Sequence, residues 1–297
     1  MIKQTLYFGS PAYLRFKNKQ LEIVKKEEDG EVIVRRPIED IGMLVLDCPQ
    51  ITISHKTIIA LQSNKAVIVS CDDKHLPHSI LLPLEGHSEQ SERYRNQISA
   101  SLPLRKILWQ QTIIAKIKNQ IAVLEKLDRP TNRLENLVQK VLSGDPTNVE
   151  GQAAAFYWSQ YIDGFIRDQF GDVPNNYLNY GYAILRAMVA RAIVSSGMLP
   201  TIGIHHKNKY NAYCLADDIM EPFRPFVDIM VNEMFQNGNL DLFLNKTDKA
   251  ELLSICQVDA LFGKKKSPLM VGVSLTTASL YDCFIGKKRK IIYPKLL

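Results

Sequence analysis

The chain has 297 residues, of which 46% are hydrophobic and 23% are charged, so its composition excludes a disordered protein. This length exceeds what a single compact core usually organises, and we therefore expect two domains. The net charge of +6 permits a polyanionic partner without requiring one.

The cysteines and the apolar segments exclude further classes of protein. The five cysteines lie far apart without a Cys-x-x-Cys pair, which argues against a disulfide scaffold and against a zinc ribbon. The N-terminus lacks the apolar stretch of a signal peptide, and no apolar run approaches the roughly 18 residues that a membrane span needs. We therefore expect a cytoplasmic protein with no membrane partner.

The N-terminal third contains the short, β-branched runs that are typical of strands. Two such runs at residues 12–16 and 21–24 flank a polar tetrapeptide, which indicates a hairpin. Ser54 can cap a short helix over residues 57–62. Further strand-like runs lie at residues 31–35, 43–46, 51–53 and 66–70. These runs predict a small, mostly antiparallel sheet, and residues 76–90 are its last strand or a linker.

From Ser88 the hydrophobic pattern changes to the period of a helix. A segment at residues 226–235 should continue the preceding helix beyond Pro222 and Pro225, which would kink it. The fold class that we predict is α+β, with a small β-rich domain at residues 1–87 and a larger all-α catalytic domain at residues 88–297. The other predicted helices lie at residues 91–101, 104–127, 134–142, 175–197, 249–262 and 275–285.

Residues 203–225 bring together two kinds of side chain that bind metals. His205 and His206 follow a turn that contains glycine, and Asp218 and Glu221 lie on the next helical segment. At about 100° per residue these two acids share a helix face, and like charges on one face repel each other. A metal ion, a proton or a basic neighbour must offset that repulsion.

Imidazole and carboxylates without a nearby thiolate pair suit Mg²⁺ or Mn²⁺ better than a structural Zn²⁺. The basic neighbours that compete with a metal are Arg224 and His206. An alternative reading is a helix N-terminal region whose acids favour the helix dipole and whose histidines are ordinary loop residues. Spacing alone leaves both readings open.

Glu150 begins a run of small residues at 151–155, where a neighbouring helix or a ligand can approach closely. Its alternative role is structural. Thr147 and Glu150 have the spacing of a capping box, in which the glutamate accepts a hydrogen bond from the backbone of the cap residue. Residue spacing does not decide between these two roles.

Lysines cluster at residues 17–19, 25–26, 264–266 and 287–290, the last together with Arg289. Such clusters either contact phosphate groups or form solvated faces. The sequence contains neither a Walker-type Gly-Lys-Ser/Thr loop nor a Gly-x-Gly-x-x-Gly motif, which argues against nucleotide hydrolysis.

Two segments together resemble a known family. The run VEGQAA at residues 149–154 and the run GIHHKNKYNAYCLADDIMEPFRP at residues 203–225 are similar to the CRISPR-associated integrase of spacer acquisition, the first Cas adaptation protein family. The resemblance covers essentially the whole chain. Residues 88–111 and 274–290 look like the type II branch of that family.

The resemblance implies a catalytic metal site for Mg²⁺ or Mn²⁺ made by Glu150, His206 and Glu221. Asp218, His205 and Arg224 would be supporting groups. His205 directly precedes His206, so the histidine assignment can shift by one position, and Asp217 stands where the family pattern is usually apolar. The resemblance also suggests phosphate contacts for a further set of basic residues, namely Arg224, Lys207, Lys209, Lys264, Lys265 and Lys266.

The family implies a metal-dependent DNA endonuclease and integrase of prokaryotic antiviral defence. It would join the 3′-hydroxyl ends of captured foreign DNA to the CRISPR leader-repeat by transesterification. The implied partners are a second copy of the chain bound through the β-rich domain, a small ferredoxin-like second adaptation protein, and the type II effector nuclease with accessory adaptation subunits. Two other functions stay open, a non-catalytic architectural DNA-binding protein and a generic metal-dependent phosphodiesterase or ribonuclease.

Overall fold

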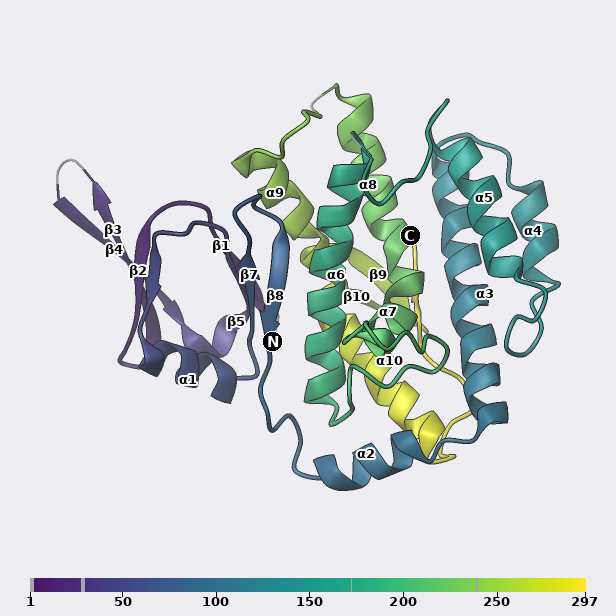
Figure 1. Ribbon diagram of the computed structural model, residues 1–297, viewed down its shortest axis with the longest axis horizontal. Coiled ribbons are helices and arrows are strands. Elements are labelled where there is room, and N and C mark those ends of the chain that lie inside the picture. Colours follow the sequence, from purple (N-terminus) through teal and green to yellow (C-terminus); the bar gives the residue numbers. More distant parts are fainter. Residues whose placement is uncertain (1–2, 28–29, 172, 239) are drawn as a thin grey trace. The chain divides into compact units, whose positions relative to one another are not determined.

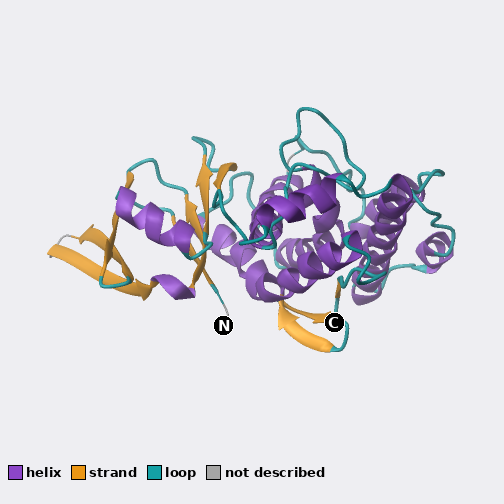
Figure 2. Ribbon diagram, turned by 90° about the horizontal axis from the view of Figure 1, so that it is seen from below, coloured by secondary structure: helices purple, strands orange, loops and turns teal. Residues whose placement is uncertain are grey.

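The computed structural model of the protein describes residues 3–27, 30–171, 173–238 and 240–297. The chain divides into two compact units between Gly86 and His87 (Figure 1). This division lies one residue before the domain boundary expected from the sequence. Strands dominate the first unit and helices dominate the second, which confirms the predicted α+β class (Figure 2).

The first unit contains two four-stranded sheets over its described residues. Its strands are β1 (Gln4–Phe8), β2 (Ala12–Lys17), β3 (Gln20–Glu27), β4 (Gly30–Pro37), β5 (Ile41–Leu46), β6 (Ile51–Ile53), β7 (Val67–Cys71) and β8 (Pro77–Leu81). In the sheet β1-β5-β7-β8, the first three strands are parallel and β8 is antiparallel. In the sheet β4-β3-β2-β6, the hairpin strands are antiparallel and β6 is parallel to β2.

The predicted hairpin is confirmed by the β2–β3 pair, whereas the prediction of one mostly antiparallel sheet was wrong. Parallel pairs join strands that are distant in sequence, so they leave no local turn signal. The short helices of this unit are η1 (Ile38–Asp40) and α1 (His55–Ser63). Ser54 caps α1 as expected, because its side chain accepts a hydrogen bond from the backbone N–H of Thr57.

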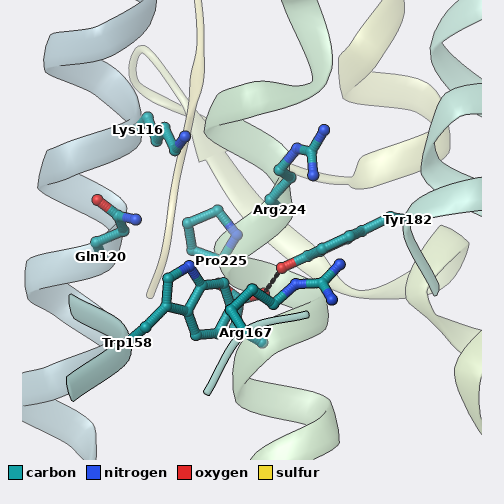
Figure 3. A pocket seen from close by; sticks show the side chains of 8 residues that line it. Lys116, Gln120, Trp158, Arg167, Tyr182, Arg224 and Pro225 are labelled. Atoms are coloured by element: carbon teal, nitrogen blue, oxygen red, sulfur yellow. Dashed lines mark hydrogen bonds between the residues drawn. The ribbon is translucent and has the colours of Figure 1, made fainter. Parts of the chain in front are cut away.

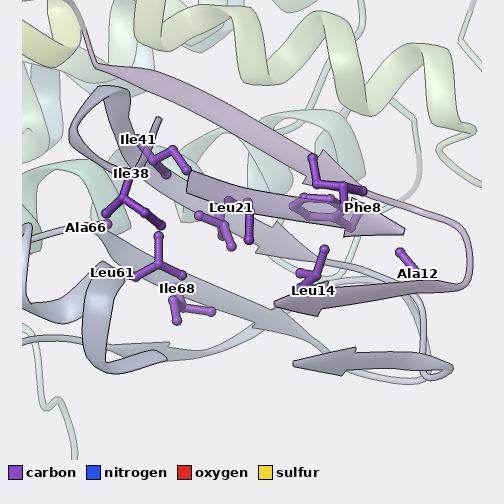
Figure 4. Close-up of a cluster of buried hydrophobic side chains, with 11 residues drawn as sticks. Phe8, Ala12, Leu14, Leu21, Ile38, Ile41, Leu61, Ala66 and Ile68 are labelled. Atoms are coloured by element: carbon purple, nitrogen blue, oxygen red, sulfur yellow. The ribbon is translucent and has the colours of Figure 1, made fainter. Parts of the chain in front are cut away.

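The core of the first unit consists of aliphatic and aromatic side chains from both sheets and from α1 (Figure 4). Each of these side chains stabilises the unit by about 2 kcal/mol when it leaves water. Members of this core are Phe8, Leu14, Leu21, Ile41, Leu61 and Ile68.

The second unit is a bundle of helices with a small sheet. Its helices are α2 (Gln90–Ile98), α3 (Leu102–Lys126), α4 (Asn132–Val138), α5 (Val149–Tyr161), α6 (Asn175–Ser195), α7 (Cys214–Met220), η2 (Glu221–Phe223), α8 (Arg224–Gln236), α9 (Lys246–Leu253), η3 (Ser254–Gln257) and α10 (Leu269–Phe284). The strands β9 (Asp259–Phe262), β10 (Lys265–Pro268) and β11 (Pro294–Lys295) pair in the order β10-β9-β11. Among the helices of the described residues, none is both long enough and apolar enough to cross a membrane.

Helix α6 lies inside the bundle and is buried on nearly every face, as its apolar sequence requires. It packs against α7, α8 and α10. Gly181 allows the close contact with α8, since a Cβ atom at this position would lie 2.5 Å from Cγ1 of Val227. This packing fixes α7 and α8, whose junction carries Glu221.

The C-terminal quarter differs from the sequence prediction. The helix expected at residues 249–262 ends at Leu253, and the residues from Asp259 to Phe262 form β9 instead. Gly263 has a φ of +63°, a conformation that suits glycine and allows the turn into β10. The last long helix begins at Leu269, six residues before its predicted start at 275.

Candidate active site

Two acidic side chains from different helices meet at one lysine. Nζ of Lys116, on α3, lies 2.5 Å from Oε1 of Glu150 on α5 and 2.7 Å from Oε2 of Glu221 in η2. Lys116 is 8% exposed and Glu221 is 6% exposed, so water screens these charges only weakly. The fold therefore brings two of the predicted site residues together around a lysine that the sequence analysis did not identify.

Lys116 and Glu221 hold each other in their charged forms. Burial opposes the charge on Lys116, but the negative charges of Glu221 and Glu150 outweigh burial and raise the pKa of the ammonium group. Burial also opposes the charge on Glu221, yet Arg224 and Lys116 lower the pKa of its carboxyl to about 2. Lys116 and Glu221 are therefore both ionised at neutral pH.

The start of α5 sets the position of Glu150. Asp145 accepts a hydrogen bond from the backbone N–H of Glu150 at 2.9 Å, and the side chain of Asn148 is the N-cap of the helix. The side chains of Asp145 and Asn148 thus accept hydrogen bonds from backbone N–H groups in the first turn of α5. The capping box considered for Thr147 and Glu150 is therefore not formed, and the carboxylate of Glu150 pairs with Lys116 instead.

Glu221 lies at the break between α7 and α8. One continuous, kinked helix was expected here, but the 3-10 turn η2 separates two helices because Pro222 has no backbone N–H to donate. The carbonyl oxygen of Pro222 accepts a hydrogen bond at 2.7 Å from Nδ2 of Asn119 on α3. Nε of Arg224 lies 3.0 Å from Oε1 of Glu221. These contacts fix Glu221 from both sides.

His206 is oriented by Asp218. Nδ1 of His206 lies 2.5 Å from Oδ1 of Asp218, which is fully buried and also accepts hydrogen bonds from the backbone N–H groups of His205 and His206. The hydrogen bond to Asp218 raises the pKa of His206, although burial opposes the rise. Because Asp218 engages Nδ1, Nε2 is the ring nitrogen that is left for a ligand. Gly203 is required in this turn, since a Cβ atom there would lie 2.5 Å from the backbone oxygen of His206.

His205 has a different environment from His206. Its ring stacks on Trp109, with the ring centroids 4.1 Å apart and the planes 2° from parallel. Burial and the neighbouring charge of His206 lower the pKa of His205. Asp218 therefore holds the ring of His206, and Trp109 holds the ring of His205.

Asp217, the residue that departs from the family pattern, forms an ion pair away from Glu221. Nε of Arg186, on α6, lies 2.6 Å from Oδ1 of Asp217. Nδ2 of Asn211 donates to the other carboxylate oxygen of Asp217 at 2.7 Å. The charge of Asp217 is thus balanced by a pair between α6 and α7.

The structure separates the predicted phosphate-binding residues into two groups. Arg224 belongs to the acidic cluster, since it pairs with Glu221 and also lies over the ring of Tyr182 at 4.7 Å. Exposed lysines make up the second group. Lys207 and Lys209 lie in the loop after His206, and Lys264, Lys265 and Lys266 lie in the β9–β10 hairpin.

Among the described residues, no three histidine, cysteine or acidic side chains come close enough together to hold a metal ion. The ammonium group of Lys116 instead lies between the two carboxylates. The carboxylate and imidazole groups nevertheless suit Mg²⁺ or Mn²⁺ as ligands. Glu150 and Glu221 already hold one positive charge between them. Asp218 contacts Nδ1 of His206, so Nε2 is the nitrogen of that ring that can bind a metal.

A cavity of about 130 Å³ adjoins the acidic cluster (Figure 3). Lys116 and Arg224 lie on its boundary, so the cavity and the cluster share two cations. Gln120 is only 2% exposed, and its Oε1 has no hydrogen-bond partner among the described residues. The other lining residues are Trp158, Arg167, Tyr182, Pro225 and Asp228.

Asp228 lines this cavity and accepts hydrogen bonds from two buried tyrosines. The hydroxyl of Tyr157 donates to one carboxylate oxygen at 2.8 Å, and the hydroxyl of Tyr182 donates to the other. Burial raises the pKa of Asp228 to about 6, although the hydrogen bonds from Tyr182 and Tyr157 oppose the rise. The cavity therefore contains one acid with a raised pKa, Asp228, beside the cations Lys116, Arg167 and Arg224.

Sequence reasoning missed Lys116, Gln120 and Arg167. A signal existed for Lys116, because it lies on the core face of α3 between the buried Ile113 and Gln120. A lysine at a core position requires a buried partner. No comparable signal exists for Arg167, which lies outside the regular helices.

The chain matches the family model described as CRISPR associated protein Cas1 over residues 6–255. The chain belongs to the Cas1 family. The resemblance read from residues 149–154 and 203–225 is thereby confirmed.

Relatives and solved structures agree with this Cas1 assignment. The CRISPR-associated endonuclease Cas1 of Neisseria meningitidis serogroup C (strain 8013) is 33% identical over 255 residues, which are 85% of this chain and 83% of the relative. A casposase bound to its integration product has a TM-score of 0.81 at 22% identity, with 98% of this chain and 93% of the casposase chain covered. A Cas6-RT-Cas1–Cas2 complex has a TM-score of 0.76 at 18% identity, with 99% of this chain and 36% of that chain covered. At these identities, the structural matches show a shared fold.

Proposed function

We propose that this Cas1 protein is a metal-dependent DNA integrase and endonuclease that joins 3′-hydroxyl ends of a DNA fragment to the CRISPR repeat. The observation that carries the proposal is the pairing of Glu150 and Glu221 around one positive charge. Two carboxylates that enclose a cation are the arrangement that phosphoryl-transfer sites use to hold a divalent ion.

Glu150, Glu221 and Nε2 of His206 would hold Mg²⁺ or Mn²⁺, and the imidazole ligand favours Mn²⁺ somewhat. When bound, such an ion supplies positive charge to a phosphodiester and lowers the pKa of a hydroxyl group. In the metal-bound form that we propose, His206 carries its proton on Nδ1, which donates to Asp218, and Nε2 presents its lone pair to the ion. Replacement of one phosphodiester by another needs no external energy, so the protein's task is to position the two DNA strands.

The cations around the cavity suit a DNA backbone. Arg167 and Arg224 line the cavity beside Glu221, and guanidinium groups bind phosphate oxygens through paired hydrogen bonds. Trp158 lines the same cavity and offers a ring on which an unpaired base can stack. We assign weaker, salt-dependent phosphate contacts to the exposed lysines Lys207, Lys209, Lys264, Lys265 and Lys266.

The proposed partners follow from the family and from its solved relatives. The related casposase was solved with an integration product, and a related Cas1 was solved in a Cas1–Cas2 complex. We therefore propose DNA and the small second adaptation protein Cas2 as partners of this chain. We also propose a homodimer formed through the β-rich unit and, on the resemblance of residues 88–111 and 274–290, an association with a type II effector nuclease and accessory adaptation subunits.

One observation favours a second candidate function. The ion pairs of Lys116 satisfy Glu150 and Glu221 without a metal, as expected if the cluster is a structural salt-bridge network in an architectural DNA-binding protein. Such a protein would bind DNA equally well with and without EDTA. A generic phosphodiesterase or ribonuclease would instead keep its metal dependence and prefer RNA or small esters.

The experiment that separates these functions is a strand-transfer assay. A short duplex with free 3′-hydroxyl ends is incubated with Cas2 and a supercoiled plasmid that carries a CRISPR leader and repeat, in Mg²⁺, Mn²⁺ or EDTA. We expect joined products only with a divalent ion, and none from the same duplex with 3′-deoxy ends. DNA binding without joining in any metal would support the architectural candidate, and cleavage confined to RNA would support the ribonuclease.

A further inference from the structure

Lys116 lies between Glu150 and Glu221, where a single cation attracts both carboxylates. The lysine is almost completely buried, and its ammonium group has contacts below 3 Å to both acids. Two carboxylates this close together repel each other strongly when nothing positive lies between them. Together with Arg224, the lysine therefore offsets the repulsion between these two acids in the metal-free protein.

The two oxygens of Glu221 have different partners, which makes an exchange of cations simple. Arg224 contacts Oε1, whereas Lys116 contacts Oε2. If the lysine leaves, Glu221 keeps the ion pair with Arg224 and retains its position. Only Oε2 of Glu221 and Oε1 of Glu150 are then freed to bind another cation.

A place for the displaced ammonium group exists beside the site. Lys116 already lines the cavity of about 130 Å³, and Gln120 lines it one helical turn further along α3 (Figure 3). Oε1 of Gln120 is buried without a hydrogen-bond partner among the described residues. A buried acceptor without a donor is unfavourable, and an ammonium group with three N–H donors can satisfy it.

We propose that Lys116 is a resident cation that competes with the divalent ion, and that binding of the ion moves its ammonium group into the cavity toward Gln120. This inference rests on the proposed function, because it assumes that Glu150 and Glu221 are metal ligands. The moved ammonium group joins Arg167 and Arg224 in the cavity. Entry of the ion thus moves the positive charge of Lys116 from the boundary of the cavity into it, where the DNA backbone is proposed to bind.

The test measures Mn²⁺ binding by titration calorimetry and thermal unfolding in EDTA, without DNA. Lys116→Met removes the competitor, and we expect it to bind Mn²⁺ at least about tenfold more tightly than the parent, a gain of about 1.4 kcal/mol. We expect a lower unfolding temperature in EDTA, because the carboxylates lose their counter-ion. Lys118→Met is the matched control, since Lys118 is an exposed lysine of the same helix and should leave both quantities unchanged.

Unchanged or weaker Mn²⁺ binding in Lys116→Met overturns the inference. If that variant does not fold, Lys116→Arg keeps the charge and should bind Mn²⁺ more weakly than the parent, because a guanidinium group pairs with carboxylates through two hydrogen bonds. Equal or tighter binding by Lys116→Arg overturns the inference as well. Failure of the proposed function looks different, because the parent and Glu221→Gln would then bind Mn²⁺ equally poorly.

Gln120 provides an independent check of the proposed movement. Gln120→Leu removes the acceptor for the displaced ammonium group, so it should weaken Mn²⁺ binding in the parent. The same substitution should have no effect in the Lys116→Met background, where no ammonium group needs a place. Equal effects in the two backgrounds overturn the assignment of the cavity as the destination of Lys116.

Discussion

Asp218 Oδ1 lies 2.5 Å from Nδ1 of His206, and the same buried carboxylate holds the backbone N–H groups of residues 205 and 206. This contact decides which ring nitrogen of His206 is left for a ligand. Asp218 is therefore expected to act through His206, without touching the ion or the DNA itself.

Substitution of Asp218 tests this role. Asp218→Asn weakens the acceptor for Nδ1–H, so we expect Mn²⁺ affinity and strand transfer to fall about 10- to 100-fold. The control is Asp217→Asn, which changes the neighbouring acid that pairs with Arg186. Calorimetry and the joining assay should give a much smaller loss for the control. Equal losses in the two variants would show that Asp218 has no specific role at His206.

The two adjacent histidines provide a second prediction. His206→Ala should reduce joining by more than about 100-fold, because it removes a ligand. His205→Ala removes a ring pair with Trp109 that is worth about 1 kcal/mol, so joining should fall by less than about tenfold. Initial rates of strand transfer measure the loss of joining in each of the two variants. A larger loss in His205→Ala than in His206→Ala would show that the assignment is displaced by one residue.

Asp228 predicts a specific dependence of stability on pH. Burial raises its pKa from 3.8 to about 6 in the folded protein, so the folded state binds a proton more tightly than the unfolded state. The contribution of Asp228 to stability is therefore full below about pH 4 and is lost as the pH rises through 6, a loss of about 3 kcal/mol.

The measurement is urea unfolding of the parent and of Asp228→Asn between pH 4 and pH 7. The contributions of the other carboxyl groups to the pH dependence cancel in the difference between the two proteins. The free energy of unfolding of the parent, relative to the variant, should fall as the pH rises across this range. A difference that does not change with pH would contradict the raised pKa.

The sequence predicts the long helices better than it predicts the strands that pair with distant segments. The helical periodicity of residues 104–127 and 175–197 predicted α3 and α6, because long amphipathic or apolar helices repeat their pattern over many turns. The strands β1 and β11 gave no usable signal. The partners of both strands lie far away in sequence, and β11 has only two residues, so tertiary pairing determines them.

In the candidate site, too, the contacts between segments distant in sequence could not be predicted. His206, Asp218 and Glu221 lie within 16 consecutive residues, so their spacing made a cluster one of two interpretations before the fold was known. Lys116 lies on a helix roughly a hundred positions earlier, and only the packing of α3 against η2 brings it to Glu221. The sequence therefore offered Arg224, His206 or a metal ion as candidates to balance the acids, whereas in the structure Lys116 contributes beside Arg224.

Substitution of Gly272, a glycine of α10, is expected to cause a large packing defect. In Gly272→Ala, the added Cβ would lie 1.9 Å from the ring of Phe262, which packs near Phe223 of η2. Overpacking of this kind should lower the free energy of unfolding by about 2 kcal/mol, although alanine usually stabilises a helix. Urea unfolding should show no comparable loss in Ser274→Ala, an exposed change on the same helix. Equal stability of the two variants would contradict the close contact.

The most direct test of the proposed metal-dependent integrase is an anomalous difference map from crystals grown with Mn²⁺. The proposal predicts one peak about 2.2 Å from carboxylate oxygens of Glu150 and Glu221 and from Nε2 of His206. In the same crystals, Nζ of Lys116 should have left the acids for the cavity beside Gln120. Mn²⁺ bound by other residues, in a protein that still joins DNA in the strand-transfer assay, would contradict the assignment of the active site.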